Sequence, residues 1–263
     1  MIPTVTDRVA LVTGVSRRAG IGFALARRLL ADGFRVLVHS WSAHDAAQPW
    51  GADPGGIDAV LEALGGLGPR LGHIEADFAE FDSPRRVVDC AVSTFGALDV
   101  LVANHAHSSE LSLEQLTAEE LDRAWSINAR AVVLLAQAYG AEHDDARPGG
   151  RIILFTPGQH LGPMADELPY AISKGAVHQA TSSLADALAD RGITVNAINP
   201  GPVDTGWAPE AEREHFIRAF PAGRWGQPDD IAAVVGWLAS DGSAWLTGQV
   251  MDVEGGFRRH RAV

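Results

Sequence analysis

The chain has 263 residues, 46% of them hydrophobic and 21% charged, which is the composition of a globular protein with one sizeable core. Its formal net charge of −12 argues against nucleic-acid binding. Cys90 is the single cysteine, which excludes an internal disulfide, and we expect a small core residue rather than a catalytic thiol. No charge-free apolar run reaches about 18 residues, and the first residues have no basic segment, so we expect a cytoplasmic protein without a membrane span or signal peptide.

Apolar runs of strand length alternate with helical patterns along the chain. The strand-like runs are Arg8–Thr13, Phe34–His39, Leu71–Ala76, Leu98–Ala103, Arg151–Thr156, Ile193–Ile198 and Gln249–Val253. The helical patterns are Ile21–Leu30 and residues near 55–67, 83–95, 117–145, 170–190 and 228–240. Buried strands separated by helices indicate a parallel sheet covered on both faces. We therefore predict one α/β domain over residues 1–263, with a Rossmann-type doubly wound sheet in a three-layer sandwich.

Two long segments, residues 40–56 and 200–228, are rich in proline, glycine or charge and show no regular pattern. Each follows a strand, so both are expected over the carboxyl edge of the sheet. Ligands bind at this edge in open α/β folds.

A glycine-rich turn, residues 13–22, joins the first strand to the first helix. Gly14 permits a tight turn, Gly20 a close approach to phosphate, and Gly22 close packing of helix on strand. The N-terminus of the helix adds a favourable potential for an anion. The turn therefore predicts dinucleotide binding.

The ends of the first two strands favour NADP(H) over NAD(H). Arg17 and Arg18 lie in the glycine turn, and either guanidinium could hold a 2′-phosphate. Where a carboxylate would bind the ribose of NAD, the second strand ends in His39, Ser40 and Trp41. The alternative is that both arginines are solvated surface charges.

Tyr170 and Lys174 are four residues apart at the start of a helical pattern and so share one helix face. A nearby ammonium favours the phenolate and is expected to lower the tyrosine pKa. Such a phenol could exchange a proton with a carbonyl or alcohol oxygen. Without context, an ordinary surface pair is the better explanation of this spacing.

The context is supplied by further motifs, over nearly the whole chain. In order, these are Thr13-Gly14 with Gly20-Ile21-Gly22, Asp77, Leu101-Val102-Ala103-Asn104, Asn128, Tyr170 with Lys174, Asn199-Pro200-Gly201, Thr247-Gly248-Gln249 and Glu254-Gly255-Gly256. With these motifs the chain resembles a classical short-chain dehydrogenase/reductase. Among members of that family, it looks most like the 3-oxoacyl-carrier-protein reductases.

The resemblance implies a role for each matched residue. Tyr170 would be the general acid/base, Lys174 would bind the nicotinamide ribose, and Asn128 would hold a water of a proton relay. The other residues expected at the cofactor are Gly14, Ser16, Arg17, Gly20, Ile21, Gly22, Ser40, Asp77, Phe78, Asn104, Pro200, Gly201, Val203 and Thr205. Residues from about 204 to 224 would form a substrate lid.

The chain departs from the family pattern at three places. The glycine turn is two residues longer than usual, and the usual N-N-A-G reads Ala103-Asn104-His105-Ala106. The substrate-binding serine, thirteen positions before Tyr170, is Pro157. Proline has no hydroxyl and cannot polarise a carbonyl. We hypothesise that Gln159 or His160 replaces the serine; the alternative is that nothing does.

Several other side chains invite a functional interpretation. His105 and His107 form too small a set for a metal, so we expect none. Asp186 and Asp190 are expected to be solvated. The lid aromatics would either line an apolar pocket or pack the lid on the core; they are Trp207, Phe216, Phe220 and Trp225.

The leading hypothesis is an NADP(H)-dependent oxidoreductase that transfers hydride to or from a small carbonyl or alcohol. One alternative keeps the fold but performs dehydration, isomerisation or enone reduction; another is a nucleotide-binding scaffold with an impaired site. The resemblance also implies a homotetramer or homodimer, formed through the helices near 117–145 and 170–190 and the last strand.

Overall fold

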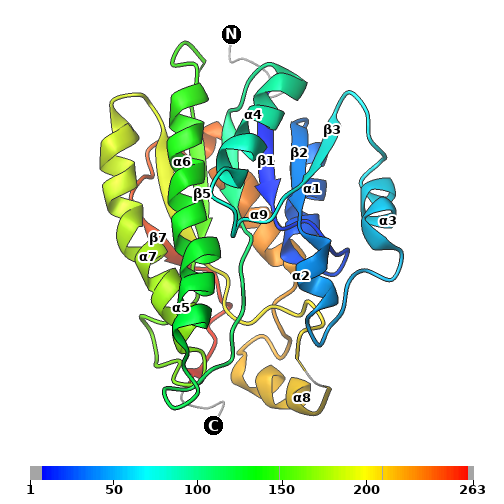
Figure 1. Cartoon of the computed structure of the whole chain (residues 1–263), viewed down its shortest axis with the longest axis vertical. Helices are drawn as coiled ribbons and strands as arrows, with labels where there is room; N and C mark the ends of the chain where they lie inside the picture. The colour runs from blue at the N-terminus through cyan, green and yellow to red at the C-terminus, as the bar shows by residue number, and fades with distance from the viewer. Residues whose placement is uncertain (1–7, 148, 209, 260–263) are drawn as a thin grey trace.

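The computed structural model describes residues 8–147, 149–208 and 210–259, except for the side chains of residues 210–212, 215 and 216. Seven parallel strands form one sheet in the order β3-β2-β1-β4-β5-β6-β7 (Figure 1). They are β1 (Val9–Thr13), β2 (Arg35–Ser40), β3 (Leu71–Glu75), β4 (Val100–Ala103), β5 (Arg151–Phe155), β6 (Thr194–Asn199) and β7 (Val250–Asp252). All predicted strands are present, and the doubly wound parallel sheet is confirmed.

The helices follow the predicted alternation, with two additions. They are α1 (Ile21–Ala31), α2 (Ser42–Ala46), α3 (Gly56–Ala63), α4 (Ser83–Phe95), α5 (Ala118–Trp125), α6 (Ala131–Glu142), α7 (Leu168–Ala189), α8 (Glu210–Ala219) and α9 (Pro228–Leu238). The predictions of irregular structure over 40–56 and 200–228 were wrong where α2 and α8 form. Helix α2 is too short to show a period, and α8 is too charged to show an apolar stripe. A π-helical turn, Ser126–Arg130, joins α5 to α6 and was not predicted.

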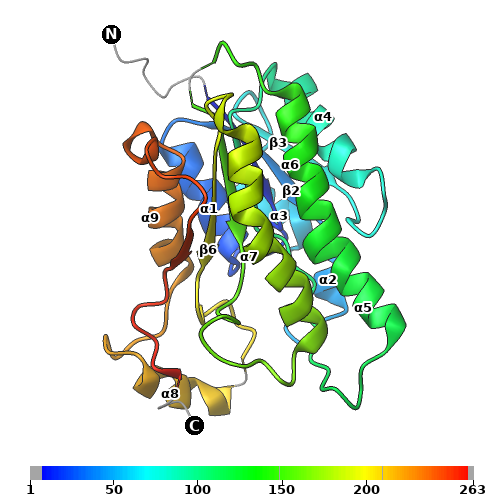
Figure 2. The same ribbon diagram turned by 90° about the vertical axis from the view of Figure 1, so that its left-hand side faces the viewer.

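Helices cover both faces of the sheet. On one face, Leu11 and Leu101 pack in a core that includes residues of α4, α6 and α7. Val12 and Val102 point to the other face and pack in a second core with residues of α1, α3 and α9. Alternate strand residues thus serve two cores, as expected for a sheet buried on both sides. Figure 2 shows the two helical layers on either side of the sheet.

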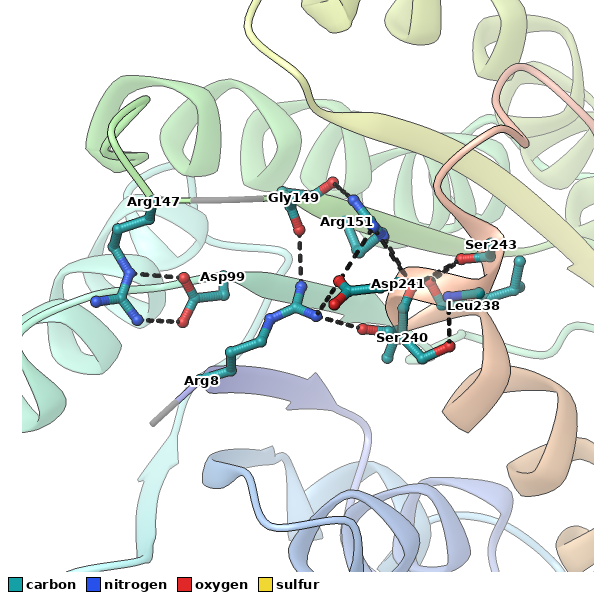
Figure 3. Close-up of polar contacts among 12 residues, drawn as sticks. Arg8, Asp99, Arg147, Gly149, Arg151, Leu238, Ser240, Asp241 and Ser243 are labelled. Atoms are coloured by element: carbon teal, nitrogen blue, oxygen red, sulfur yellow. Dashed lines mark hydrogen bonds and ion pairs between the residues drawn. The ribbon is translucent and has the colours of Figure 1, made fainter. Parts of the chain in front are cut away.

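A network of ion pairs and hydrogen bonds fixes the amino edge of the sheet (Figure 3). The buried carboxylate of Asp99 accepts hydrogen bonds from the N–H of Val9 (2.7 Å) and from Nε and Nη2 of Arg147 (2.7 and 2.9 Å). Arg8 donates to the carbonyl oxygen of Gly149 (2.7 Å). These contacts hold the beginnings of β1 and β4 together, at the edge opposite the predicted site.

The carboxyl edge of the sheet carries the loops that the motifs occupy. The glycine turn follows β1, residues 104–117 follow β4, residues 156–167 follow β5, and residues 200–208 follow β6. Helix α8 lies beyond this edge, at the bottom of Figure 1. None of the helices in the described ranges combines the length and hydropathy that crossing a bilayer requires.

Candidate active site

The glycine turn has the close backbone packing that its sequence predicts. Gly14 has a φ of +75°, and a Cβ there would lie 2.9 Å from Cα of His105. A Cβ on Gly22 would lie 2.2 Å from the carbonyl oxygen of Gly14. The side-chain amide of Asn104 donates to the carbonyl oxygens of Thr13 (3.0 Å) and Gly14 (3.3 Å). Only glycine fits at positions 14 and 22 without displacing backbone.

The N-terminus of α1, which follows this turn, is open to an anion. Its N-cap is Gly20, which offers no side-chain cap, and its first turn holds no acidic residue. The first N–H groups of a helix have no partner within the helix, and the helix dipole favours negative charge there. Gly20 and Ile21 therefore lie where a pyrophosphate could bind.

The two arginines of the turn contact different segments. Arg18 forms an ion pair with Asp53 through Nη2 (2.7 Å) and Nε (3.0 Å), and its own N–H also donates to that carboxylate (2.9 Å). The Arg18 guanidinium lowers the pKa of the Asp53 carboxyl to about 2. Arg17 instead donates to the carbonyl oxygen of Thr205 (3.0 Å), and its guanidinium lies over the ring of Trp50. Arg18 is thus engaged by Asp53, a residue that the sequence analysis did not single out.

The end of β2 is held by polar contacts within the protein. The hydroxyl of Ser40 bonds to Nε2 of His73 (2.8 Å), and that of Ser16 accepts from the N–H of Trp41 (3.4 Å). His39 is buried; its Nδ1 accepts from the N–H of Gly14 (3.3 Å) and its Nε2 faces the carbonyl oxygen of Ala76. Burial lowers the pKa of His39 to about 4, so the ring is neutral and supports the glycine turn.

Phe78 is stacked between two histidines. Its ring lies 4.1 Å from that of His39 and 4.2 Å from that of His105, and the residue is 3% exposed. A cofactor contact at this position would therefore be made by the backbone. The neighbouring Asp77 is half-buried, and its Oδ1 accepts from the N–H of Ala79 (2.8 Å).

Lys174 lies one turn after Tyr170 on α7, as the spacing predicts. It is fully buried, and its ammonium donates to the carbonyl oxygens of Phe155 (3.0 Å) and His105 (3.4 Å). Burial lowers the pKa of Lys174 to about 8. The lysine is thus fixed between the ends of β4 and β5.

The pKa of Tyr170 moves in the direction opposite to the prediction. Burial raises it, and the negative charge of Glu167 raises it further. The ammonium of Lys174 donates to two main-chain carbonyl oxygens, and its charge does not offset these two effects on the Tyr170 pKa. Burial, together with the charges of Glu110 and Asp166, also raises the pKa of Glu167.

Asn128 lies in the π-helical turn and connects two parts of the site. Its Oδ1 accepts from the N–H of His107 (2.7 Å), and its Nδ2 donates to the carbonyl oxygen of His107 (2.9 Å) and to Oγ of Ser173 (3.0 Å). In the same turn, the carbonyl oxygen of Ile127 is hydrogen-bonded to Nε2 of His105 (3.0 Å). The side chain of Asn128 makes hydrogen bonds to other residues of the protein, so the predicted contact with a water would be made by its backbone.

The loop after β5 contains Pro157 and both candidate substitutes for the serine. Nε2 of Gln159 donates to Oγ1 of Thr156 (3.2 Å). Nε2 of His160 lies 3.2 Å from Oδ1 of Asp252, and its ring lies 4.7 Å from that of His178. Each candidate donor therefore has a partner within the protein, and its role toward a substrate stays a prediction.

The segment after β6 lies against the lid. Gly201 has a φ of +61°, and its N–H donates to Oδ1 of Asn199 (3.0 Å). Pro200 precedes it, and Val203 forms a bridge with Gly226. Thr205 supplies the carbonyl oxygen that Arg17 contacts.

Two lid aromatics pack inward. Trp225 and Phe220 are buried, and Phe220 lies 5.0 Å from the ring of Phe257. Trp207 remains partly exposed and donates to the carbonyl oxygen of Val203 (2.9 Å). The side chain of Phe216 is outside the described part of the chain.

The remaining side chains have structural explanations. Cys90 is half-buried in α4 and packs against the core, while Asp186 of α7 and Asp190, just after its end, are exposed. Within the described residues, no group of three or more His, Cys, Asp or Glu side chains could hold a metal ion.

Comparisons with known proteins agree with this architecture. A family model described as enoyl-(acyl carrier protein) reductase matches residues 14–258. The chain is 35% identical over 254 residues to the uncharacterized oxidoreductase YjdA of Bacillus subtilis, covering 96% of this chain and 98% of that protein. It is 33% identical over 258 residues to an NADPH-dependent aldehyde reductase-like chloroplastic protein of Arabidopsis thaliana, covering 95% and 94%. It also resembles the solved structure of LugOII, described as a promiscuous reductase that catalyses keto-reduction at C1 during lugdunomycin biosynthesis. That match has a TM-score of 0.82 and 34% identity over 96% of this chain and 98% of the other.

Proposed function

Because the chain belongs to the classical short-chain dehydrogenase/reductase family, we propose that it is an NADP(H)-dependent ketoreductase acting on 3-oxoacyl-like carbonyl compounds or the corresponding alcohols. One observation carries the proposal. Tyr170 and the buried Lys174 lie one turn apart at the same sheet edge as an uncapped, glycine-rich helix N-terminus.

The residues after β1 fit a nicotinamide dinucleotide, which would supply or accept the hydride. The backbone packing at Gly14 and Gly22 leaves no room for a Cβ, so the turn keeps its tight shape, and α1 begins without a competing acidic cap. The backbone N–H of Ile21 would hold the pyrophosphate, while that of Gly20 donates to the carbonyl oxygen of Arg17 (3.0 Å). Asp77 would face the adenine, and Asn104 would lie near the ribose.

Tyr170 and Lys174 would control the transfer of the proton that accompanies the hydride. The raised pKa of Tyr170 keeps its phenol protonated at neutral pH, which is the form that donates a proton to a carbonyl oxygen during reduction. Lys174 would bind the nicotinamide ribose and favour the phenolate once the proton has left. Its bonds to the carbonyl oxygens of Phe155 and His105 hold it in reach.

Three observations support NADP(H) over NAD(H). The end of β2 carries no carboxylate that would repel a 2′-phosphate. Arg17 lies in the turn with a guanidinium that makes one hydrogen bond to a carbonyl oxygen, whereas Arg18 is paired with Asp53. The Arabidopsis relative is named as NADPH-dependent. The test compares NADPH and NADH affinity in the wild type and in Arg17→Ala, which should lose affinity for NADPH only.

Activity would be tested by mixing the protein with NADPH and a panel of 3-oxoacyl thioesters, simple ketones and enones. Consumption of the reduced nicotinamide with ketones supports the proposal. Consumption with enones alone would replace it with enone reduction, and tight cofactor binding without turnover would make the protein a binding scaffold.

We further propose a homotetramer or homodimer in the cytoplasm. A groove between α5 and α7 is lined in part by Trp125, Pro169 and Ile172, and the Trp125 and Ile172 side chains are half-exposed. Such apolar surface suits a second copy of the chain. Sizing chromatography should give a dimer or tetramer that Ile172→Glu dissociates; a wild-type monomer would contradict the proposal.

A further inference from the structure

A shielded ion pair near the C-terminus lies between two segments of the site. Nη1 and Nη2 of Arg259 each lie 2.7 Å from a carboxylate oxygen of Glu254, in a bidentate pair. The two side chains are 22% and 11% exposed. We call residues 157–162 the substrate loop and residues 199–201 the cofactor segment.

The pair is in close contact with one glycine from each segment. A Cβ on Gly158, in the substrate loop, would lie 1.9 Å from Nη2 of Arg259. A Cβ on Gly201, in the cofactor segment, would lie 2.4 Å from Cβ of Glu254. Since real Cβ atoms do not approach so closely, both glycines are required for this packing. The ion pair therefore acts as a spacer between the two segments.

Asn199 joins the cofactor segment to the C-terminal segment through hydrogen bonds. Its Nδ2 donates to Glu254 Oε2 (2.9 Å) and to Asp252 Oδ1 (2.8 Å), and its Oδ1 accepts from the N–H of Gly201 (3.0 Å). Asp252 in turn contacts His160 of the substrate loop at 3.2 Å. The substrate loop thus meets the C-terminal segment at two points, where Gly158 packs against Arg259 and where His160 contacts Asp252.

We propose that Glu254 and Arg259 are positioning residues, which set the placement of the substrate loop relative to the cofactor segment. The inference rests on the proposed function, in which a carbonyl carbon must meet the nicotinamide beside residues 199–201. Hydride transfer depends steeply on that distance, and a displacement of about 1 Å can slow a reaction by on the order of 100-fold. With Pro157 in place of a serine, the loop has one fewer hydroxyl to hold a substrate. The rate of hydride transfer should therefore depend more strongly on where the loop lies.

The first test removes the guanidinium. Arg259→Ala should lower kcat for ketone reduction by on the order of 10- to 100-fold while leaving the NADPH dissociation constant unchanged. Arg259→Lys should recover only part of the rate, because an ammonium cannot make two parallel bonds to one carboxylate. Arg258→Ala is the matched control, since it removes the same charge from the adjacent, exposed side chain.

The second test uses the contact with Gly158. Gly158→Ala should slow the enzyme because its methyl group displaces Arg259. In the Arg259→Ala background the methyl group no longer meets the guanidinium and keeps only a close contact of 3.1 Å with Nδ2 of Asn199, so the double variant should be close to Arg259→Ala alone. Additive losses in the double variant would overturn the spacer role.

A third measurement does not depend on turnover. Hydrogen–deuterium exchange of the peptide spanning residues 156–164 should rise in Arg259→Ala and stay at the wild-type level in Arg258→Ala. If the wild type reduces no ketone, the proposed function fails, whereas the exchange result still tests the positioning. Wild-type kcat together with unchanged exchange in Arg259→Ala would overturn the inference. If Arg259→Ala does not fold, the same two readouts apply to Arg259→Lys.

Discussion

The ammonium of Lys174 lies 3.0 Å from the main-chain oxygen of Phe155, at a position with 1% exposure. A buried lysine with no carboxylate partner among its described contacts is unfavourable for folding, since burial penalises its charged form. The chemistry proposed for the site explains why a lysine is buried beside Tyr170.

The burial of Lys174 predicts a specific dependence of stability on pH. Burial lowers its pKa from 10.5 to about 8. Between these values the unfolded chain binds the proton and the folded chain does not, so stability rises with pH across this window. Relative to Lys174→Met, the unfolding free energy of the cofactor-free wild type should increase by about 3 kcal/mol from about pH 7 to about pH 10.5. Urea titrations of both proteins measure this, and identical pH profiles would show that the lysine is not buried as described.

The ion pair between Arg18 and Asp53 should hold the loop after β2 against the glycine turn. Asp53→Asn is expected to lower Tm and weaken NADPH binding, because four of the five hydrogen bonds that the carboxylate accepts from described residues come from Arg18. The stabilisation should be complete above about pH 4 and decline as the pH falls toward about 2, the pKa of Asp53 in the folded protein. Asp58→Asn, an exposed carboxylate of α3, is the control. Equal effects of the two substitutions would contradict the role of the pair.

Glycine 22 offers a steric test of the cofactor turn. A methyl group at Gly22 would lie 2.2 Å from the carbonyl oxygen of Gly14, so Gly22→Ala must displace the turn. NADPH binding should weaken by about tenfold or more, or about 1.4 kcal/mol. Gly175→Ala, in the interior of α7 with open space around it, should instead stabilise the protein by about 0.5–1 kcal/mol and leave binding unchanged. Calorimetric titration with NADPH would distinguish the two, and normal affinity in Gly22→Ala would count against dinucleotide binding at this turn.

The features that could be predicted from the sequence are local or periodic. The strands show as continuous apolar runs, the glycine turn as a fixed spacing after β1, and Tyr170 with Lys174 as neighbours on one helix face. Each depends on residues close together in the chain, whose geometry follows from the backbone alone.

The features that could not be predicted depend on contacts between distant segments. Asp53 meets Arg18 across 35 positions, and Arg259 reaches Gly158 from the far end of the chain. The raised pKa of Tyr170 also depends on tertiary structure, because burial and Glu167 determine it rather than the lysine one turn away. No local pattern specifies any of these contacts.

Pro157 provides a gain-of-function prediction. Pro157→Ser would restore a hydroxyl at the position that lacks one, and kcat for ketone reduction should rise by on the order of 10- to 100-fold. If Gln159 supplies the missing donor, Gln159→Ala should slow the wild type but not Pro157→Ser. Unchanged rates in Gln159→Ala and in His160→Ala would show that neither side chain replaces the serine.

In the proposed reaction, the Tyr170 phenol exchanges the proton that accompanies hydride transfer. Single-turnover oxidation of bound NADPH by a reactive ketone measures that step in the wild type and in Tyr170→Phe, with cofactor affinity determined in parallel. Tyr170→Phe should bind NADPH normally and lose hydride transfer by on the order of 100-fold or more. Full hydride transfer in Tyr170→Phe would contradict it.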